Sequence, residues 1–372
     1  MDLTFKYEES TVFALRSLYS KYGYSQYKMN KFEEYDLYVK NKDFLISDSV
    51  ITFTDTNGKL MALKPDVTLS IVKNSKDIKG YVEKLYYNEN VYRVSKGSKT
   101  FKEIMQVGLE CIGDIDDYCI SEVITLAAGS LKAINKNSVL SISHLGILSA
   151  VLDSVNITPF VKSDIIKCIE EKNEHELKKQ CKENGIDDDT TAILSKFISI
   201  YGSPDNVLPK IKNLSNNSEY TAAVKNLENI LSLIEETEIK DMLQIDFSVV
   251  SDAKYYNGIV FKGFIEQIPN SVLSGGQYDA LMHRMGKKSA AIGFAIYLDM
   301  LDPLKTNDSE FEQDIIVLYD ETTNISALKR FIDGLIAKGN RVSAQRVVPE
   351  RLTYRQLISF KNGEVEIIEN NA

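Results

Sequence analysis

The sequence has 372 residues, of which 44% are hydrophobic and 26% charged, a composition typical of a globular protein with one large domain and one or two smaller units. Its formal net charge of −9 gives no overall attraction for phosphate backbones, which weighs against a nucleic-acid binder. The acidic N-terminus lacks a signal-peptide core, and no apolar run approaches the ~18 residues that span a bilayer, so we expect a cytoplasmic protein without membrane contact.

The first part of the chain predicts one amphipathic helix and one hairpin. Apolar residues at helical spacing predict a helix that ends at Gly23, with Ser10 and Thr11 upstream as candidate caps. Farther along, Asn57-Gly58 is the strongest short hairpin signal, and strand-like segments flank it.

A helix and two long strands are expected next. Pro65 and Asp66 open a helix that runs to about Lys73, because proline suits the first turn and an acidic side chain suits the positive end of the helix dipole. Strands are predicted over 86–94 and 102–112, with a polar, lysine-rich loop between them.

The second of these strands carries a row of polar residues. Strand residues alternate between two faces, so Gln106, Gly108 and Glu110 share one face while Val107 and Leu109 share the other. Because apolar strands flank this run, we expect the polar face to look into a cavity, with the glycine letting a small ligand approach the backbone. The alternatives are a solvated sheet face and a buried polar network without a ligand.

The composition changes near Pro159. Before it, we expect a helix over 122–134 and a strand followed by a helix over 141–155. After it, short amphipathic helices with Lys- and Glu-rich faces continue to about residue 238. We interpret 159–238 as a helical insertion whose charged faces are solvated.

The last part of the core predicts turns and helices around glycine. A strand pattern resumes over 243–250, and Asn257-Gly258 predicts a second hairpin. Residues 274–279 predict a tight glycine turn into a helix, and Gly293 is expected to open another helix that ends at Pro303.

The C-terminal residues form a separate pattern. A polar run over 305–309 predicts a linker, after which strand and helix patterns alternate. The sequence therefore divides into a core over 1–303, which contains the insertion, and a small C-terminal α/β domain over 312–372.

Several classes of catalytic site have no support. Four cysteines without a CxxC pair, and three histidines outside any motif, predict neither a metal site nor a nucleophilic triad. Gly275-Gly276 is not followed by the Gly-Lys-Ser/Thr of a phosphate-binding loop, and no cofactor is expected.

Six short motifs follow one another along the chain: Leu63-Lys64-Pro65-Asp66-Val67-Thr68, Val91-Tyr92-Arg93, Gln106-x-Gly108-x-Glu110, Tyr255-Tyr256-Asn257-Gly258-Ile259-Val260-Phe261, Gly275-Gly276-Gln277-Tyr278-Asp279 and Gly293-Phe294-Ala295. In this order they resemble the catalytic core of the class II aminoacyl-tRNA synthetases, specifically histidyl-tRNA synthetase. The resemblance implies an α+β fold, with a mainly antiparallel sheet flanked by helices. It also implies a homodimer formed through the N-terminal region of the synthetase-like core.

In that family the matching segments form the pocket for free histidine. The implied histidine-binding residues are Asp66, Thr68, Arg93, Gln106, Glu110, Tyr255 and Tyr256. By this resemblance, Asp66, Thr68 and Gln106 would hold the ammonium group, and Glu110 and Tyr256 would bind the imidazole ring. An ammonium group donates three hydrogen bonds and needs acceptors, and a protonated ring nitrogen suits a carboxylate or a phenol.

The chain departs from the synthetase pattern at positions where the family carries arginine. Ser251 stands in the histidine-specific signature, Gln277 in the glycine motif, and Met300 at the position that binds the nucleotide triphosphate, whereas Arg93 is retained. Adenylate formation brings negative charges together and depends on positioned cations. We therefore expect a histidine-binding protein without catalytic residues.

These departures, with a C-terminal unit shorter than an anticodon-binding domain, resemble the regulatory subunits of ATP phosphoribosyltransferase, which are synthetase paralogues. The resemblance implies a non-catalytic partner of the short catalytic subunit in the first step of histidine biosynthesis, with histidine as the feedback ligand. Two alternatives remain open: a divergent active histidyl-tRNA synthetase and a stand-alone histidine-binding protein.

Overall fold

The computed structural model describes residues 7–45, 50–94, 100–250, 255–304, 311–348, 350–361 and 363–371. The chain forms two compact units, Met1–Leu304 and Lys305–Ala372. The predicted linker over 305–309 lies outside the described residues. Within the described ranges, every helix is too short or too polar to span a lipid bilayer.

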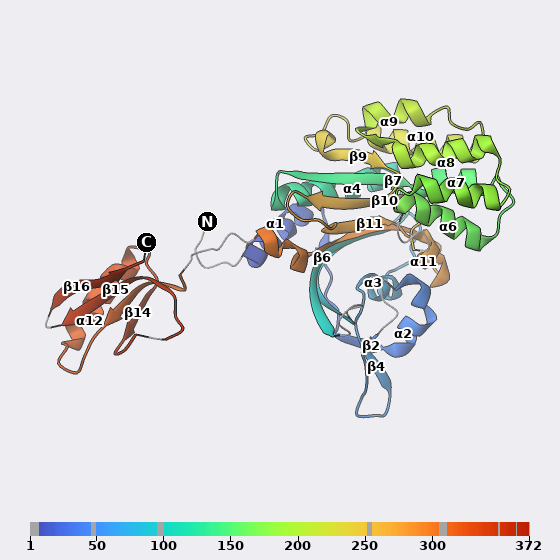
Figure 1. Ribbon diagram of the computed structural model, residues 1–372. Helices are drawn as coiled ribbons and strands as arrows, with labels where there is room; N and C mark the ends of the chain where they lie inside the picture. Colours follow the sequence, from blue (N-terminus) through green and yellow to red (C-terminus); the bar gives the residue numbers. More distant parts are fainter. Residues whose placement is uncertain are drawn as a thin grey trace. The chain divides into compact units, whose positions relative to one another are not determined.

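A sheet of nine strands forms the centre of the larger unit, as far as the chain is described, in the order β1-β5-β6-β12-β11-β10-β7-β9-β8 (Figure 1). The strands are β1 (Ser25–Gln26), β5 (Val82–Val94), β6 (Phe101–Gly113), β12 (Ala290–Tyr297), β11 (Leu273–Gln277), β10 (Ile259–Ile265), β7 (Ser138–His144), β9 (Leu243–Asp246) and β8 (Tyr201–Gly202). Neighbours from β5 to β7 are antiparallel, whereas β1 with β5 and β7 with β9 are parallel. The expected mainly antiparallel sheet flanked by helices is confirmed.

The two faces of this sheet pack against different helices. On one face, Val107 and Leu109 of β6 join the main core with helices α1 (Tyr7–Lys21) and α4 (Asp117–Ile134). On the other face, Tyr87 of β5 joins a second core with α3 (Thr68–Asn74) and α11 (Asp279–Arg284). The remaining short elements of this part of the core are α2 (Tyr35–Lys40), α5 (Leu145–Leu152) and the 3-10 turns η1 (Lys42–Phe44), η2 (Lys240–Met242) and η3 (Leu298–Leu304).

The early elements follow the prediction except at the starts of α1 and α3. Helix α3 begins at Thr68, so Pro65 and Asp66 precede its first turn rather than open it. Gly23 ends α1 with a φ of +82°. The helix begins at Tyr7, however, so Ser10 and Thr11 are not caps, and both hydroxyls donate to the Tyr7 carbonyl at 2.8 Å. The predicted hairpin is present in a small sheet of β2 (Phe32–Glu34), β4 (Leu60–Leu63) and β3 (Thr52–Thr54).

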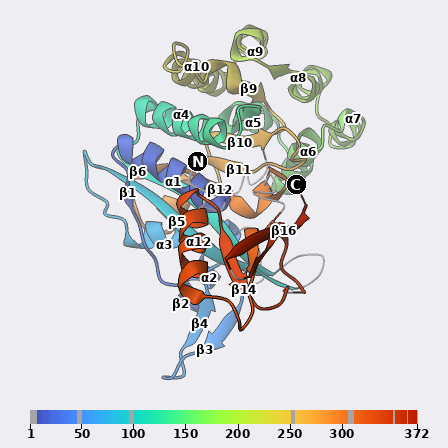
Figure 2. The ribbon, with the colours of Figure 1, turned by 90° about the vertical axis from the view of Figure 1, so that its left-hand side faces the viewer.

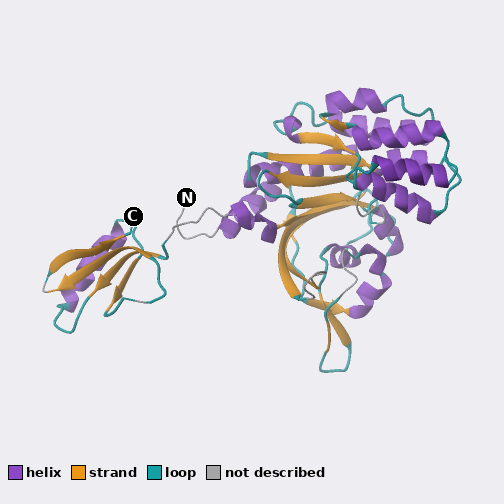
Figure 3. Ribbon diagram, in the orientation of Figure 1, coloured by secondary structure: helices purple, strands orange, loops and turns teal. Residues whose placement is uncertain are grey.

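The insertion is helical, as expected. Its helices in the described chain are α6 (Pro159–Glu170), α7 (Glu174–Glu183), α8 (Asp188–Ser199), α9 (Pro204–Ile211) and α10 (Ser218–Ser232). Figures 1 and 2 place α9 and α10 beside β9, at the opposite end of the unit from the small three-stranded sheet, with α6 next to α7. Figure 3 shows the same division, with helices gathered at this end.

The predicted glycine turn and the helix from Gly293 are wrong. Gly275-Gly276 lies inside β11 and Gly293 lies inside β12, at the centre of the large sheet. A Cβ atom on Gly275 would lie 2.5 Å from the Gly293 carbonyl oxygen and 2.5 Å from the Phe294 Cβ. These glycines therefore allow close approach of strands and side chains rather than a change of chain direction.

The predicted hairpin at Asn257-Gly258 is also wrong. Strand β9 pairs with β7, and β10 lies between β7 and β11, so β9 and β10 are not neighbours in the sheet. Asn257 instead accepts a hydrogen bond from the Asp279 backbone N–H at 2.7 Å, and its amide donates to the Asp279 carboxylate at 2.9 Å. This exchange anchors the segment to the start of α11.

The C-terminal unit is a small α/β unit with one sheet, in the order β14-β13-β15-β16. Its elements are β13 (Gln313–Leu318), α12 (Ile325–Ala337), β14 (Val342–Gln345), β15 (Tyr354–Lys361) and β16 (Glu364–Asn370). Strand β13 is parallel to both of its neighbours, and β16 is antiparallel to β15. Ile315, Leu328 and Phe360 belong to the apolar core of this unit.

Candidate functional site

A cavity of about 570 Å³ opens in the larger unit, on the sheet face that carries α3. This volume falls in the range of ~300–1,000 Å³ that is usual for small-molecule sites. The structure places all seven residues of the implied histidine pocket in its lining: Asp66, Thr68, Arg93, Gln106, Glu110, Tyr255 and Tyr256. Side chains from four separate stretches of sequence therefore meet in one cavity.

The polar row of β6 faces this cavity. Gln106 and Glu110 are only 3% and 2% exposed, whereas Val107 and Leu109 pack into the core on the opposite face. The expectation that Gly108 leaves room for a ligand is wrong. A Cβ atom there would lie 2.5 Å from the Tyr87 hydroxyl, so Tyr87 already occupies that space.

Glu110 receives hydrogen bonds from two different elements. The Thr68 hydroxyl donates to Oε1 at 2.7 Å, and the Tyr278 hydroxyl donates to Oε2 at 2.6 Å. Burial raises the pKa of Glu110 to about 8, against the opposing effect of these two hydrogen bonds, and the Asp66 carboxylate raises it further. A positively charged ligand beside these two buried carboxyl groups would lower their pKa and favour their ionised forms, so the cavity suits a cationic ligand that ionises them on binding.

Asp66 and Arg93 lie where α3 begins. The Asp66 carboxylate accepts a hydrogen bond from the Leu69 backbone N–H at 2.8 Å. Burial raises the pKa of Asp66, while this hydrogen bond and the positive charge of Arg93 oppose the increase. Arg93 Nε donates to the Pro65 carbonyl at 3.0 Å, so the retained arginine supports the segment that carries Asp66.

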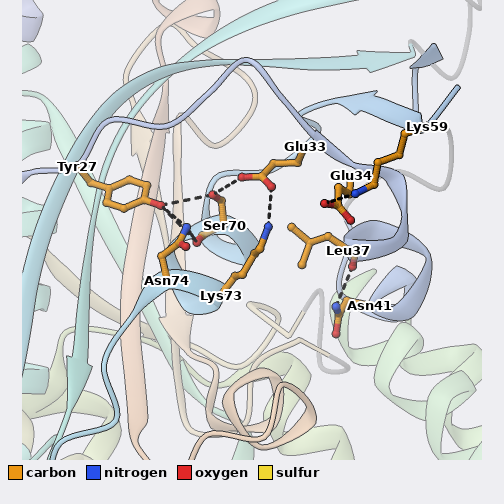
Figure 4. A network of polar contacts seen from close by, with 9 residues as sticks. All are labelled: Tyr27, Glu33, Glu34, Leu37, Asn41, Lys59, Ser70, Lys73 and Asn74. Atoms are coloured by element: carbon orange, nitrogen blue, oxygen red, sulfur yellow. Dashed lines mark hydrogen bonds and ion pairs between the residues drawn. The ribbon is translucent and has the colours of Figure 1, made fainter. Parts of the chain in front are cut away.

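A polar network holds α3 in place (Figure 4). Glu33 of β2 accepts hydrogen bonds from Ser70 Oγ at 3.2 Å and from Lys73 Nζ at 2.8 Å. The Tyr27 hydroxyl lies 3.4 Å from Ser70 Oγ. Because α3 also carries Thr68, this network positions one of the two donors to the buried Glu110 carboxylate.

Tyrosine rings form an aromatic part of the cavity wall. The ring centroid of Tyr255 lies 4.7 Å from that of Tyr256 and 5.8 Å from that of Tyr278. Burial raises the pKa of Tyr87, Tyr255 and Tyr278 far above the usual value, so their hydroxyls are neutral and can donate hydrogen bonds. The sequence prediction missed Tyr278 as a site residue, although its glycine motif contains it.

The helical insertion supplies another part of the wall, which the sequence prediction also missed. The residues of α6 in the cavity lining are Pro159, Lys162, Ser163, Ile166, Lys167 and Glu170. Their spacing of three and four residues places them on one face of the helix, whereas Ile165 and Ile169 pack into the core. This face stays exposed at Ser163, Lys167 and Glu170, as expected for a solvated charged face, and it borders the cavity as well.

Two of the positions that depart from the synthetase pattern, Gln277 and Met300, are not among the described residues that line the cavity. The Gln277 side-chain oxygen accepts a hydrogen bond from the Ile259 backbone N–H at 2.8 Å, which ties β11 to the start of β10. Met300 lies in η3. Ser251 lies outside the described residues.

Comparison with known proteins shows the family of the chain. Residues 3–301 match the sequence model of the histidyl-tRNA synthetase family. An ATP phosphoribosyltransferase regulatory subunit from Clostridium novyi (strain NT) is 30% identical over 309 residues, which cover 80% of this chain and 73% of the relative. The chain belongs to the histidyl-tRNA synthetase-like family of ATP phosphoribosyltransferase regulatory subunits.

A second member of this family extends the match. The regulatory subunit from Oceanobacillus iheyensis is 26% identical over 364 residues, which cover 96% of this chain and 87% of the relative. The alignment therefore includes most of the C-terminal unit as well as the core.

Solved structures share the fold of the family. A regulatory subunit/histidyl-tRNA synthetase from Bacillus halodurans has a TM-score of 0.79 at 22% identity and covers 95% of this chain and 93% of its own. A chain of the ATP phosphoribosyl transferase (HisG:HisZ) complex from Thermotoga maritima has a TM-score of 0.61 at 19% identity, covering 78% and 97%. At these identities, the likeness concerns the fold.

Proposed function

We propose that the chain is a non-catalytic regulatory subunit that partners the short catalytic subunit of ATP phosphoribosyltransferase in the first step of histidine biosynthesis. Two regulatory subunits with matches over most of their length support this role. A complex of two kinds of subunit among the structures with the same fold supports the partnership.

Histidine is the proposed ligand of the cavity. The observation that carries this proposal is the pair of short hydrogen bonds from Thr68 and Tyr278 to the buried Glu110 carboxylate. These donors fix both carboxylate oxygens in position, and a protonated imidazole nitrogen would add a third donor to the same group. Asp66 and Gln106 are then available as acceptors for the ammonium group.

The proposed lack of synthetase catalysis rests on two positions, Gln277 and Met300, where uncharged residues stand in place of arginine. Gln277 has no charge and uses its side-chain oxygen on a backbone N–H, and Met300 cannot stabilise a phosphate charge. Removing one preorganised charge-stabilising group commonly costs ~10²–10³ in rate. Two such replacements are sufficient to reduce adenylate formation to a negligible rate.

The small sheet supports the proposal of a homodimer. The rings of Phe32 and Phe53 pack edge to face with centroids 5.5 Å apart, yet these side chains are 48% and 39% exposed. An exposed aromatic pair of this kind is typical of a surface that a second protein covers.

Sedimentation of the wild type as a dimer, and of a Phe32→Ser/Phe53→Ser variant as a monomer, would support this surface as the dimer interface. A dimer in both would exclude it.

Feedback by histidine follows if the ligand favours one state of the complex. The coupling is reciprocal, so the catalytic subunit must change the affinity of this chain for histidine by the same factor. Histidine affinities measured with and without the catalytic subunit test this equality.

The proposed function is tested by calorimetric titration with histidine, and then with ATP in the presence of histidine and magnesium. We expect heat from histidine binding and none from ATP. Saturable binding of ATP would favour the second candidate, a divergent histidyl-tRNA synthetase, for which the retention of Arg93 in the cavity is the supporting observation. That candidate requires histidine-dependent exchange between ATP and pyrophosphate.

A further inference from the structure

Helix α6 turns a polar face toward the cavity, although it belongs to the insertion and lies far in sequence from the synthetase motifs. The face carries two cations, Lys162 and Lys167, with Ser163 between them. A helix on the surface of a bundle normally gives such a face to water. Here the same face is exposed to water at Ser163 and Lys167 and also borders a cavity whose other wall carries buried carboxyl groups.

The charges around the cavity suit a ligand that carries both signs. Among the described residues, the acidic groups of the lining are Asp66, Glu110 and Glu170. The basic groups are Arg93, Lys162 and Lys167. The two buried acidic groups, Asp66 and Glu110, belong to the synthetase-like motifs. Both lysines belong to α6 of the insertion. An amino acid has one carboxylate and at least one ammonium group, so it requires this combination of charges.

Arg93 is already engaged with the acidic side of the cavity. Its Nε atom donates to the Pro65 carbonyl at 3.0 Å, and its charge opposes the rise in the pKa of Asp66. Among the described residues of the lining, Lys162 and Lys167 are the other cations that can meet the carboxylate of the ligand.

We propose that Lys162 and Lys167 of helix α6 bind the carboxylate of the amino-acid ligand, while its ammonium and imidazole groups face Asp66 and Glu110. This inference rests on the proposed function of the cavity and extends it. The insertion then becomes a part of the binding site, because it contributes the groups that distinguish an amino acid from an amine.

The ion pairs of the two lysines leave them able to bind a ligand. Lys162 Nζ lies 2.7 Å from the Asp153 carboxylate, whose side chain is 57% exposed, and Lys167 Nζ lies 3.8 Å from the Glu171 carboxylate. The Lys162 side chain is 27% exposed and the Lys167 side chain 68%, and ion pairs with exposed partners contribute little to stability, so their replacement by a ligand costs little. The first turn of α6 also lines the cavity at Pro159, and the positive end of the helix dipole adds to the attraction for a carboxylate.

The experiment is a calorimetric titration of the full chain with histidine and with histamine, which keeps the imidazole and the ammonium group but lacks the carboxylate. The test variant is Lys162→Ala/Lys167→Ala. The matched control is Lys178→Ala/Lys179→Ala on α7, which removes two lysines that also form exposed ion pairs within the insertion. Thermal unfolding of both variants verifies that each is folded.

We expect the test variant to bind histidine on the order of ten-fold more weakly than the wild type, because a hydrogen bond to a charged group is lost. Its affinity for histamine should equal that of the wild type, and the control should match the wild type for both ligands. Equal histidine affinity in the test variant and the control would overturn the inference and leave the proposed function intact. Failure of the wild type to bind histidine at all would overturn both.

Discussion

The hydroxyl of Tyr278 donates a 2.6 Å hydrogen bond to Oε2 of Glu110, although 168 residues separate the two in sequence. Tyr278 immediately precedes helix α11, and Glu110 lies on strand β6. Since both side chains are buried beside the cavity, this bond connects two distant motifs and sets the orientation of the acceptor that a ligand would meet.

Replacing Tyr278 by phenylalanine tests this connection. Tyr278→Phe should weaken histidine binding about ten-fold and lower the free energy of unfolding by about 1–3 kcal/mol, because a buried carboxyl group loses one partner. Tyr19→Phe is the matched control, since it removes a buried hydroxyl that lies 3.0 Å from Ser130 in the main core. The control should lose stability and keep histidine affinity. Unchanged histidine affinity in Tyr278→Phe would contradict the role given to this bond.

The raised pKa of Glu110 predicts a pH-dependent stability. Between its usual pKa of 4.5 and its folded pKa of about 8, this group holds a proton in the folded chain and has lost it in the unfolded chain. Its contribution to stability is therefore full below the lower value and declines as the pH rises to the upper one, by about 1.4 kcal/mol per pH unit at most.

Urea unfolding between pH 5 and pH 8 measures this slope. Glu110→Gln cannot titrate, so its free energy of unfolding should decline less steeply with pH than that of the wild type. Burial also raises the pKa of Asp66, which acts in the same direction and is present in both proteins. Equal slopes in the two proteins would show that Glu110 does not titrate in this range.

Gly293 lies where β12 passes the carboxylate of Glu110. A Cβ atom at this position would overlap Oε2 of Glu110 and would lie 2.5 Å from the Leu109 carbonyl oxygen. Gly293→Ala should therefore unfold at a clearly lower temperature and lose most of its histidine affinity. Gly334→Ala is the control, because a Cβ atom there meets nothing within 4 Å in helix α12, and it should gain about 0.5–1 kcal/mol. A Gly293→Ala protein with normal stability would mean that the strands can separate at this point.

The network of Figure 4 offers a pair of adjacent acidic residues with different roles. Glu33 binds Ser70 and Lys73 of α3, whereas Glu34 forms an exposed ion pair with Lys59 at 2.6 Å. Glu33→Ala should lower the melting temperature and weaken histidine binding, because α3 carries Thr68. Glu34→Ala should leave both unchanged. If both variants lost histidine affinity to the same extent, the contacts of Glu33 with α3 would not be what supports histidine binding.

The local patterns of the sequence predict the faces of a single strand better than they predict which strands lie side by side in the sheet. The alternation of Gln106, Val107 and Glu110 identified the two faces of β6, because the period of a strand depends only on its own residues. The placement of Gly275 and Gly293 depends on which strand lies beside them, and glycine is typical of turns as well as of closely packed strands. Both positions were therefore assigned to the wrong kind of element.

The site could be predicted in part for the same reason. The motifs identified side chains such as Asp66 and Glu110, which occupy one cavity in the structure. Tyr278 and the cavity face of α6 depend on how distant segments pack. For α6, the spacing of polar residues indicates a solvated face, but it does not show that this exposed face also borders a cavity.

The central claim is tested most directly by the phosphoribosyl-transfer rate of the short catalytic subunit mixed with this chain, measured at increasing histidine concentration with wild type and with Glu110→Ala. We predict that both forms of the chain raise the rate above that of the catalytic subunit alone. Histidine should then inhibit the wild-type complex at concentrations that leave the Glu110→Ala complex active. No increase in rate on mixing would contradict the regulatory role, and equal inhibition of the two complexes would place the regulatory histidine outside this cavity.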